Sequence, residues 1–208
     1  MASRFKEFIE SLVLGRAPFH SSTFSVFHIF YVLELLSEKP QGRDRLAKKL
    51  SVGTRTMRTI LGRLKDAGLI EVSRRGCYLA ERGLLIWKKF GTLFPKFVEI
   101  KENELTISKH NYLFLVRNKG NTIKSSIELR DLAMVNGAQR AISLLFKADQ
   151  LIIPSVSNNV REEFPKAANE ILEVVRPCDN DVIIIASAES PLKSKRAAFL
   201  ASWALIDV

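Results

Sequence analysis

Apolar residues in the first third of the chain recur at the three- and four-residue spacing that is typical of helices. This spacing predicts amphipathic helices over 24–37, 43–50 and 54–67. Residues 51–53 predict a turn between the second and third helices, and Gly68 is placed to cap the end of the third. The apolar face of the third helix consists of Met57, Ile60, Leu61 and Leu64. We therefore expect a small bundle of three helices in this part of the chain.

Two short runs of strand-forming residues follow the third helix. They span 69–73 and 77–80 and flank the turn residues Arg74-Arg75-Gly76, so they predict a hairpin. Helix, helix, turn, helix and hairpin is the order of a winged helix-turn-helix, a module that binds DNA with the helix after the turn.

A further helix is predicted over 81–94, where Trp87, Phe90 and Phe94 give it more aromatic surface than a lone linker needs. These side chains either pack on the C-terminal domain or form a dimer seam, and packing is the simpler interpretation. The segment 5–12 is also amphipathic at helical spacing and is expected to add to the same surface.

From Lys96 onward the pattern alternates between strands and helices. Strands are predicted over 96–101, 112–116, 141–147, 150–154 and 182–186, and helices over 123–134, 160–175 and 191–205. The order ββαββαβα predicts a mixed sheet with helices packed on it. The predicted fold class is α+β, with a winged helix-turn-helix domain over 1–95 joined by a linker helix to a sensor-type α+β domain over 96–208.

The positive charge is distributed unequally between these two predicted domains. The 208 residues carry 32 Lys or Arg and 22 Asp or Glu, a formal net charge of +10. The segment 39–89 alone holds 14 basic and 4 acidic residues, whereas residues 96–208 hold 15 and 14. A basic excess confined to one module favours a polyanionic partner such as nucleic acid.

The chemistry of the basic module fits double-stranded DNA. Arginine can donate two hydrogen bonds to guanine, and threonine can contact phosphates or the thymine methyl group. We expect the third helix to enter the major groove and the hairpin tip to contact the flanking backbone. The predicted DNA-binding residues are Arg43, Thr54, Arg55, Thr56, Arg58, Thr59, Arg63, Arg74 and Arg75. For any one of these arginines, a solvated charged face on a helical bundle is the alternative.

A set of residues between Phe24 and Gly83 forms a recognisable pattern. It consists of Phe24, His28, Gly42-Arg43, Leu46-Ala47, Gly53, Arg58-Thr59, Leu61, Leu64, Gly68-Leu69-Ile70, Arg75-Gly76, Leu79 and Gly83. This pattern resembles an archaeal family of winged-helix proteins that are classed as transcriptional regulators and carry a C-terminal domain of unknown function. The stretches 128–138 and 180–186 resemble that second domain, although Gln139 and Arg140 stand where the family has a run of small residues. The resemblance implies DNA binding and an archaeal source.

A candidate effector site lies in the predicted second domain. The loop from Ser187 to Ser190 lies between a buried strand and a helix, so its backbone N–H groups would face a bound anion. Arg130 lies in the middle of a predicted helix that breaks at Asn136-Gly137. The predicted effector-binding residues are Arg130, Asn136, Gly137, Ser187 and Ser190. The alternatives are that Ser190 only caps a helix and that Gly137 only ends one.

Several other classes of protein are disfavoured by what the sequence lacks. No apolar run approaches the roughly 18 residues of a membrane-spanning helix, and the N-terminus lacks the pattern of a secretory signal. Cys77 and Cys178 stand alone, and His20, His28 and His110 are not spaced as metal ligands. His28 lies on an apolar helix face, where a satisfied core histidine is expected. No phosphate-binding glycine loop or hydrolase motif occurs, so we expect no cofactor, no metal and no catalysis.

These observations predict a cytoplasmic, DNA-binding transcriptional regulator that forms a homodimer. Its second domain is expected to bind a small-molecule effector or to mediate dimerisation. Two alternatives from other classes stay open. The winged helix could serve as a protein-interaction scaffold, or the second domain could be an enzyme acting on a small anionic metabolite.

Overall fold

The computed structural model describes residues 2–14, 23–123 and 126–206. The chain forms two compact units, Met1–Phe90 and Gly91–Val208. The boundary lies before the predicted one at residue 95, because the ring of Phe94 packs against Phe114 and Phe199 of the second unit at 5.8 Å in both cases.

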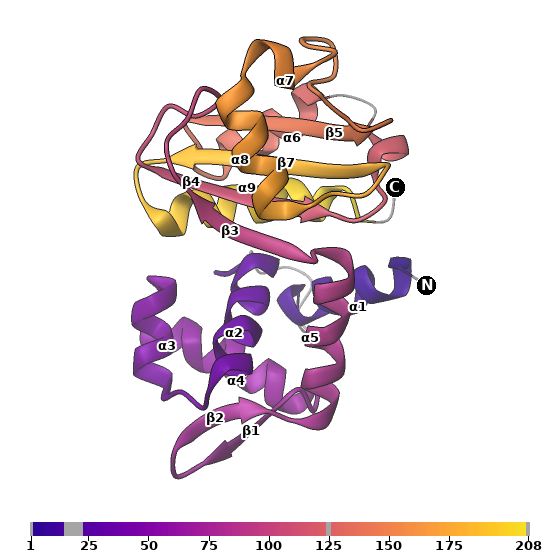
Figure 1. The fold of residues 1–208 in the computed structure, drawn as a ribbon. Coiled ribbons are helices and arrows are strands. Elements are labelled where there is room, and N and C mark those ends of the chain that lie inside the picture. The colour runs from indigo at the N-terminus through magenta and orange to yellow at the C-terminus, as the bar shows by residue number, and fades with distance from the viewer. Residues whose placement is uncertain (1, 15–22, 124–125, 207–208) are drawn as a thin grey trace. The chain divides into compact units, whose positions relative to one another are not determined.

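The first unit begins with four helices and a hairpin in the order that the sequence predicts (Figure 1). Its elements are α1 (Ala2–Leu14), α2 (Val26–Glu38), α3 (Arg43–Leu50), α4 (Thr54–Asp66), β1 (Ile70–Ser73), β2 (Gly76–Leu79) and most of α5 (Glu81–Leu93). Strands β1 and β2 pair antiparallel, with Ser73 opposite Gly76.

Helix α2 is buried on most sides, although the spacing of its apolar residues predicts an amphipathic helix. Helices α1 and α3 and strand β2 all pack against it, so few of its positions face solvent. His28 is buried on this helix, and its Nδ1 accepts a hydrogen bond from the backbone N–H of Ser25 at 3.0 Å. The prediction that His28 is a satisfied core residue is confirmed.

Aromatic side chains from three helices form part of the first core. Phe90 of α5 is fully buried and lies 5.1 Å from the ring of Phe5 and 5.3 Å from that of Phe30. Trp87 packs at 5.6 Å from Phe30. The segment 5–12 thus contributes to the core of the first unit, and Phe90 and Trp87 pack within that unit.

The second unit is an α+β layer structure. Its elements are β3 (Lys96–Ile100), β4 (His110–Val116), the 3-10 turn η1 (Gly120–Thr122), α6 (Ser126–Val135), β5 (Arg140–Lys147), β6 (Gln150–Ile152), α7 (Val160–Glu163), α8 (Pro165–Val175), β7 (Asp181–Ala188) and α9 (Pro191–Ala204). The strand order is β3-β4-β7-β5-β6. Figure 1 shows α8 on one side of this sheet and α6 and α9 on the other.

The sheet is antiparallel throughout its described strands, so the prediction of a mixed sheet is wrong. Strands β4 and β5 run parallel to each other, but β7 lies between them and runs antiparallel to both. The helix predicted over 160–175 is also divided, because Pro165 starts α8 at its first position and Phe164 separates α8 from α7.

The side chains of the sheet form a separate core on each face. Alternate residues of β4 and β7 pack with α8, for example Leu113 and Ile185 with Ile171. The intervening residue Phe114 packs on the other face with Phe199 of α9, at 5.7 Å between ring centroids. Both faces are therefore covered, and β7 is buried along its whole length.

Candidate functional site

The exposed face of α4 carries four of the nine predicted DNA-binding residues, Thr54, Arg55, Arg58 and Thr59. Arg55, Arg58 and Thr59 are exposed, whereas Met57 and Ile60 are completely buried. The two sides of the helix therefore divide as the sequence predicts. The hydroxyl of Thr59 donates to the carbonyl oxygen of Arg55 at 3.2 Å, which fixes its orientation along the helix.

The first turn of α4 is suited to a negatively charged ligand. Its N-cap is Gly53, which has no side chain to accept from the first N–H groups, and the turn contains no acidic residue. Thr54 is exposed in this turn and Thr56 is half-buried. The free N–H groups and the positive end of the helix dipole favour an anion such as a phosphate.

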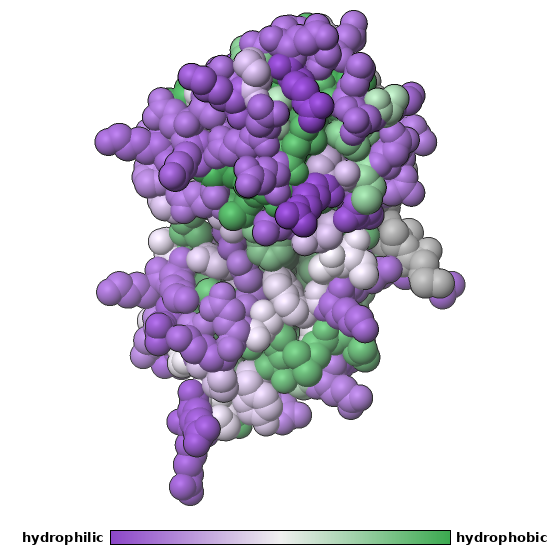
Figure 2. Space-filling view, in the orientation of Figure 1, coloured by the Kyte–Doolittle hydropathy of each residue, from purple (hydrophilic) through white to green (hydrophobic). Residues whose placement is uncertain are grey.

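Arg74 and Arg75 occupy the two-residue turn between β1 and β2. The hydroxyl of Ser73 accepts from the Arg75 N–H at 3.1 Å and donates to the carbonyl of Gly76 at 3.1 Å. Both arginines are exposed and have no ion-pair partner among the described residues. Figure 2 shows the hairpin tip as a hydrophilic projection from the first unit. The tip thus presents two unpaired guanidinium groups on a short, ordered turn.

Strand β2 of the hairpin is held, close to the turn, by a contact that the sequence did not reveal. Gln41, between α2 and α3, exchanges two backbone hydrogen bonds with Cys77, at 3.0 and 2.9 Å. The buried amide of Gln41 also donates to the carbonyl of Leu35 at 2.8 Å. Burial raises the pKa of the Cys77 thiol, and the charge of Arg43 lowers it in part. The hairpin is therefore extended by a third chain segment that fixes its position on the helices.

Arg43 lies at the first position of α3 and has an exposed side chain. Its Nε lies 3.5 Å from the carboxylate of the neighbouring Asp44. Such an exposed pair is weak in water, so the guanidinium remains available to a phosphate. This position is compatible with the predicted DNA contact.

Arg63 is turned away from the face that carries Arg55 and Arg58. Its Nη1 donates to the carbonyl oxygens of Leu12, at 3.0 Å, and of Val13, and its guanidinium lies 5.0 Å above the ring of Phe24. The last carbonyls of a helix have no partner within it, and α1 has no basic residue in its last turn. Arg63 therefore caps α1, and its position does not support the prediction that it contacts DNA.

Replacing Arg63 by alanine is expected to lower the free energy of unfolding by about 2 kcal/mol, because two hydrogen bonds from a charged donor are lost. DNA affinity should change less than twofold at temperatures where the variant is folded. Urea unfolding and a DNA titration measure the two effects. Lys65→Ala, an exposed change near the end of the same helix, is the control. If Arg63→Ala is as stable as Lys65→Ala but binds DNA much more weakly, Arg63 contacts DNA after all.

The predicted effector residues are mostly engaged in ending or starting helices. Gly137 has φ +101 and ends α6. Its N–H donates to the carbonyl oxygen of Met134, and the N–H of Ala138 donates to that of Ala133. This is the Schellman arrangement. The side chain of Asn136 donates to the carbonyl of Leu132 at 2.8 Å. Asn136 and Gly137 are thus explained by the end of α6.

The start of α9 already has its own polar partners. The hydroxyl of Ser190 accepts from the N–H of Lys193 at 3.3 Å, and the Lys193 ammonium lies 2.7 Å from the carboxylate of Glu189. This hydrogen bond from Lys193 lowers the pKa of Glu189. Ser187 is buried within β7, with 2% of its surface exposed. The alternative that Ser190 acts as a helix cap is confirmed.

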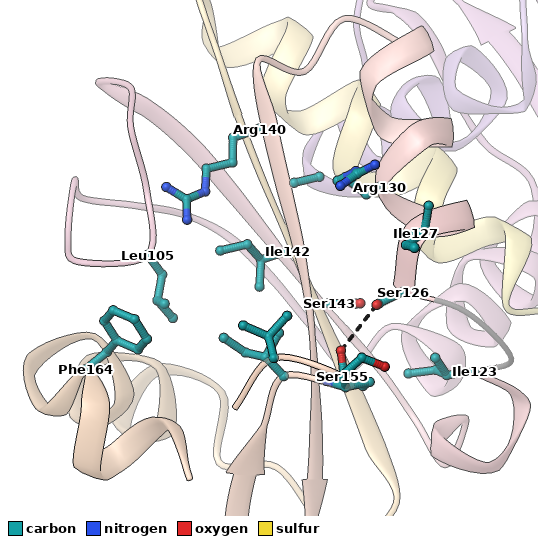
Figure 3. Close-up of a pocket in the computed structure, with 14 residues that line it drawn as sticks. Leu105, Ile123, Ser126, Ile127, Arg130, Arg140, Ile142, Ser143, Ser155 and Phe164 are labelled. Atoms are coloured by element: carbon teal, nitrogen blue, oxygen red, sulfur yellow. Dashed lines mark hydrogen bonds between the residues drawn. The ribbon is translucent and has the colours of Figure 1, made fainter. Parts of the chain in front are cut away.

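Arg130 is the member of this predicted set that lines a cavity. A cleft of about 590 Å³ lies beside α6 and the first half of β5, and Arg130 and Arg140 both line it (Figure 3). Arg130 also bonds its neighbour Asp131 at 3.1 Å. Asn136, Gly137, Ser187 and Ser190 do not line this cleft, so the structure separates them from Arg130.

Two further observations bear on the class of protein. Within the described ranges, no helix is both long and apolar enough to cross a membrane. In the same part of the chain, His, Cys, Asp and Glu do not gather in groups of three or more that could hold a metal ion. His20 lies outside the described residues.

Comparisons with known proteins relate both parts of the chain to one archaeal protein. Residues 28–84 match the family described as "PH0730-like, N-terminal domain", and residues 107–205 match the "Domain of unknown function (DUF4443)". The solved structure of hypothetical protein PH0730 from Pyrococcus horikoshii OT3 is similar, with a TM-score of 0.71 and 26% identity over 88% of this chain and 92% of that chain. The chain is thus similar to the PH0730-like N-terminal domain in its first part and to this domain of unknown function in its second.

A second solved structure gives a much weaker match. Wild-type ZitR of Lactococcus lactis has a TM-score of 0.31 and 24% identity, over 43% of this chain and 64% of that chain. None of the curated proteins compared matches this chain. The resemblance to an archaeal two-domain family is therefore supported by PH0730 and by the two domain matches.

Proposed function

We propose that this chain is a DNA-binding transcriptional regulator and that its first unit is a winged helix-turn-helix. The observation that carries the proposal is the exposed face of α4. It presents Arg55, Arg58 and Thr59 to solvent, and residues 54–65 contain no acidic residue. An arginine- and threonine-rich face on the helix after a turn is suited to the base edges and phosphates of a major groove.

The rest of the first unit supports a phosphate-binding role on either side of this helix. The uncapped start of α4 offers backbone N–H groups. Arg43 on α3 and Arg74 and Arg75 on the hairpin tip are exposed cations. In the proposed complex α4 enters the major groove, and these arginines contact the DNA backbone beside it.

As part of the same proposal, the chain acts as a homodimer in the cytoplasm of an archaeal cell and catalyses no reaction. A dimer would read two half-sites and so gain affinity and specificity. The second unit binds an effector or mediates the pairing. The archaeal source is supported by the similarity to the Pyrococcus horikoshii protein.

The full-length chain is expected to bind duplex DNA with a steep salt dependence. Each phosphate contact lowers the slope of log K against log salt by about 0.9. If all five exposed arginines, two on α4, two on the hairpin and Arg43, contact phosphates, they predict a slope of about −4.5 per monomer. A fluorescence-anisotropy titration at several salt concentrations measures it, and selection of bound genomic fragments supplies the preferred sequence.

The same measurement separates the proposal from its main rival. A protein-interaction scaffold would have no need of phosphate contacts, so a slope close to zero, or no enrichment of any fragment, contradicts the proposal. A suitable control removes two positive charges from the second unit and leaves the first unit unchanged, for example Arg161→Gln with Arg196→Gln. Both arginines are exposed in the second unit, and their loss should leave the slope unchanged.

A further inference from the structure

The cleft of the second unit is formed where the sheet lacks a strand. Strand β6 pairs only with Leu145–Lys147, so Arg140–Leu144 have no strand partner on that side among the described residues. An unpaired edge is normally covered or blocked. Here α6 rises beside one face of the edge, and Leu105 and Phe164 lie beside the other (Figure 3). The uncovered edge thus becomes the floor of a cleft.

The lining of this cleft is mostly apolar. Its volume of about 590 Å³ falls within the range of roughly 300–1,000 Å³ that is usual for small-molecule sites. The apolar lining residues are Leu105, Ile123, Ile127, Ala141, Ile142, Ile153, Pro154, Val156 and Phe164. A surface of this kind favours an apolar molecular body over a strongly hydrated one.

Two cations lie at one end of the cleft. Figure 3 shows the guanidinium groups of Arg130 and Arg140 at the same end, with Ile142 between this end and the serines Ser126 and Ser143. Arg130 is partly neutralised by Asp131, whereas Arg140 has no partner among the described residues. No acidic residue is among those that line the cleft. An unpaired arginine beside an apolar surface favours a carboxylate, which it can bind through two parallel hydrogen bonds.

A buried hydroxyl adds an independent sign of a ligand. Ser143 lines the cleft from β5, is 4% exposed, and its Oγ has no hydrogen-bond partner in the described part of the chain. A buried polar atom without a partner is costly and is uncommon in folded proteins. A polar atom on a bound molecule would supply the missing hydrogen bond.

We propose that this cleft binds a small amphipathic carboxylate. Its carboxylate pairs with Arg140, its apolar body lies on the isoleucines of the cleft, and a further polar atom bonds the hydroxyl of Ser143. This site differs from the one predicted around Asn136, Gly137, Ser187 and Ser190. The proposal goes beyond DNA binding and does not depend on it, because the binding can be measured without DNA.

Decanoate, decylamine and decan-1-ol are suitable probes because they share one apolar body and differ in the charge of the head group. The full-length chain is labelled with ¹³C in its isoleucine methyl groups and titrated with each probe. Decanoate is expected to shift the signals of Ile123, Ile127, Ile142 and Ile153, which line the cleft. Buried isoleucines of the first unit, such as Ile29 and Ile60, should not shift. Decylamine and decan-1-ol are expected to bind at least about tenfold more weakly.

Substitution of Arg140 tests whether this side chain binds the carboxylate of the probe. Arg140→Gln is expected to weaken decanoate binding about tenfold or more, since an ion-paired hydrogen bond is lost. Arg196→Gln, an exposed change on α9 outside the cleft, should leave the affinity unchanged. Equal binding of decanoate and decylamine, an unaltered affinity of Arg140→Gln, or shifts confined to other methyl groups would each overturn the proposal.

Ser143→Ala tests the buried hydroxyl separately. The probe 10-hydroxydecanoate is expected to bind more tightly than decanoate to the natural chain, and Ser143→Ala is expected to remove this difference. Its thermal midpoint should be equal to that of the natural chain or higher, because an unpartnered buried hydroxyl has been removed. A lower thermal midpoint of Ser143→Ala would show that the hydroxyl already has a hydrogen-bond partner. An unchanged preference for 10-hydroxydecanoate would show that Ser143 does not contact the ligand.

Discussion

Replacing Arg55 and Arg58 together by glutamine is expected to weaken binding to duplex DNA about a hundredfold or more. Each well-placed arginine that contacts a base is worth about 1–3 kcal/mol, and each contact with a phosphate also adds to the salt dependence. Both side chains are exposed on α4, and the completely buried Met57 and Ile60 hold the opposite face. The double variant should therefore fold normally, so that lost binding reflects lost contacts.

The salt dependence distinguishes the two kinds of contact. If both arginines contact phosphates, the slope of log K against log salt should become shallower by about 2, since each contributes about 0.9. If they contact base edges, the slope should change less, and the preference for the selected sequence should disappear instead. Titrations of the selected fragment and of a scrambled fragment at three salt concentrations measure both quantities.

The charge-matched control is the double variant Arg161→Gln, Arg196→Gln, which removes the same charge from exposed positions in the second unit. It should bind DNA like the natural chain. If the Arg55 and Arg58 variant also retains its affinity and its sequence preference, α4 is not the recognition helix. If both variants lose affinity equally, the effect is one of total charge and not of a specific surface.

The organisation of the first unit could be predicted because its local signals agree. The i, i+3, i+4, i+7 spacing of Met57, Ile60, Leu61 and Leu64 defines the buried face of α4, and three of the four are fully buried. Gly68, at φ +69, ends the helix as predicted. These signals are local in sequence, and each residue type has one dominant physical reason to occur there.

Long-range contacts could not be predicted in the same way. The pairing of Arg63 with the carbonyls of Leu12 and Val13 spans about fifty residues, and the spacing of charges along α4 alone gives no sign of it. The strand order is a second case, since nothing in the stretch 182–186 shows that β7 inserts between β4 and β5. Both depend on which surfaces meet in three dimensions.

The ligand cleft was missed for a related reason. The sequence directed attention to Ser187 and Ser190, because a strand followed by a helix start is a familiar anion site. The cleft instead depends on the length of β6, which ends at Ile152 and leaves Arg140–Leu144 of β5 without a strand partner on that side. Arg140 is the first residue of β5, after Gln139 and before Ala141, and this local sequence does not indicate a ligand. Arg140 lines the cleft because no strand covers this part of the edge of the sheet.

Gly76→Ala is the second substitution for which a large effect is expected, a loss of about 3–5 kcal/mol from the unfolding free energy of the first unit. Gly76 has φ +115, a conformation that is strained for any residue with a side chain. A Cβ there would lie 2.6 Å from both the carbonyl carbon and oxygen of Gln41. Backbone atoms cannot rotate aside, so Gln41 must move and its two hydrogen bonds with Cys77 must break.

Trp87, which packs on Phe30 in the first unit, gives a fluorescence signal for urea unfolding once Trp203 of the second unit is replaced by phenylalanine. In that background Gly62→Ala is the control, because no atom lies within 4 Å of a Cβ at Gly62. Alanine in this exposed helical position should stabilise α4 by about 0.5–1 kcal/mol. A Gly76→Ala variant as stable as the natural chain would show that the backbone of Gln41 can move without loss of unfolding free energy.

The same variant links the fold of the hairpin to the proposed function. Arg74 and Arg75 can reach a DNA backbone only while the hairpin is held in place, and the described contacts that hold β2 include the Gln41–Cys77 pair. At a urea concentration where Gly76→Ala remains folded, its DNA affinity should fall toward that of an Arg74→Gln, Arg75→Gln variant. The two changes should also not add when combined, because both act through the same guanidinium groups. Full additivity would mean that the hairpin tip and its attachment to Gln41 contribute to DNA binding independently.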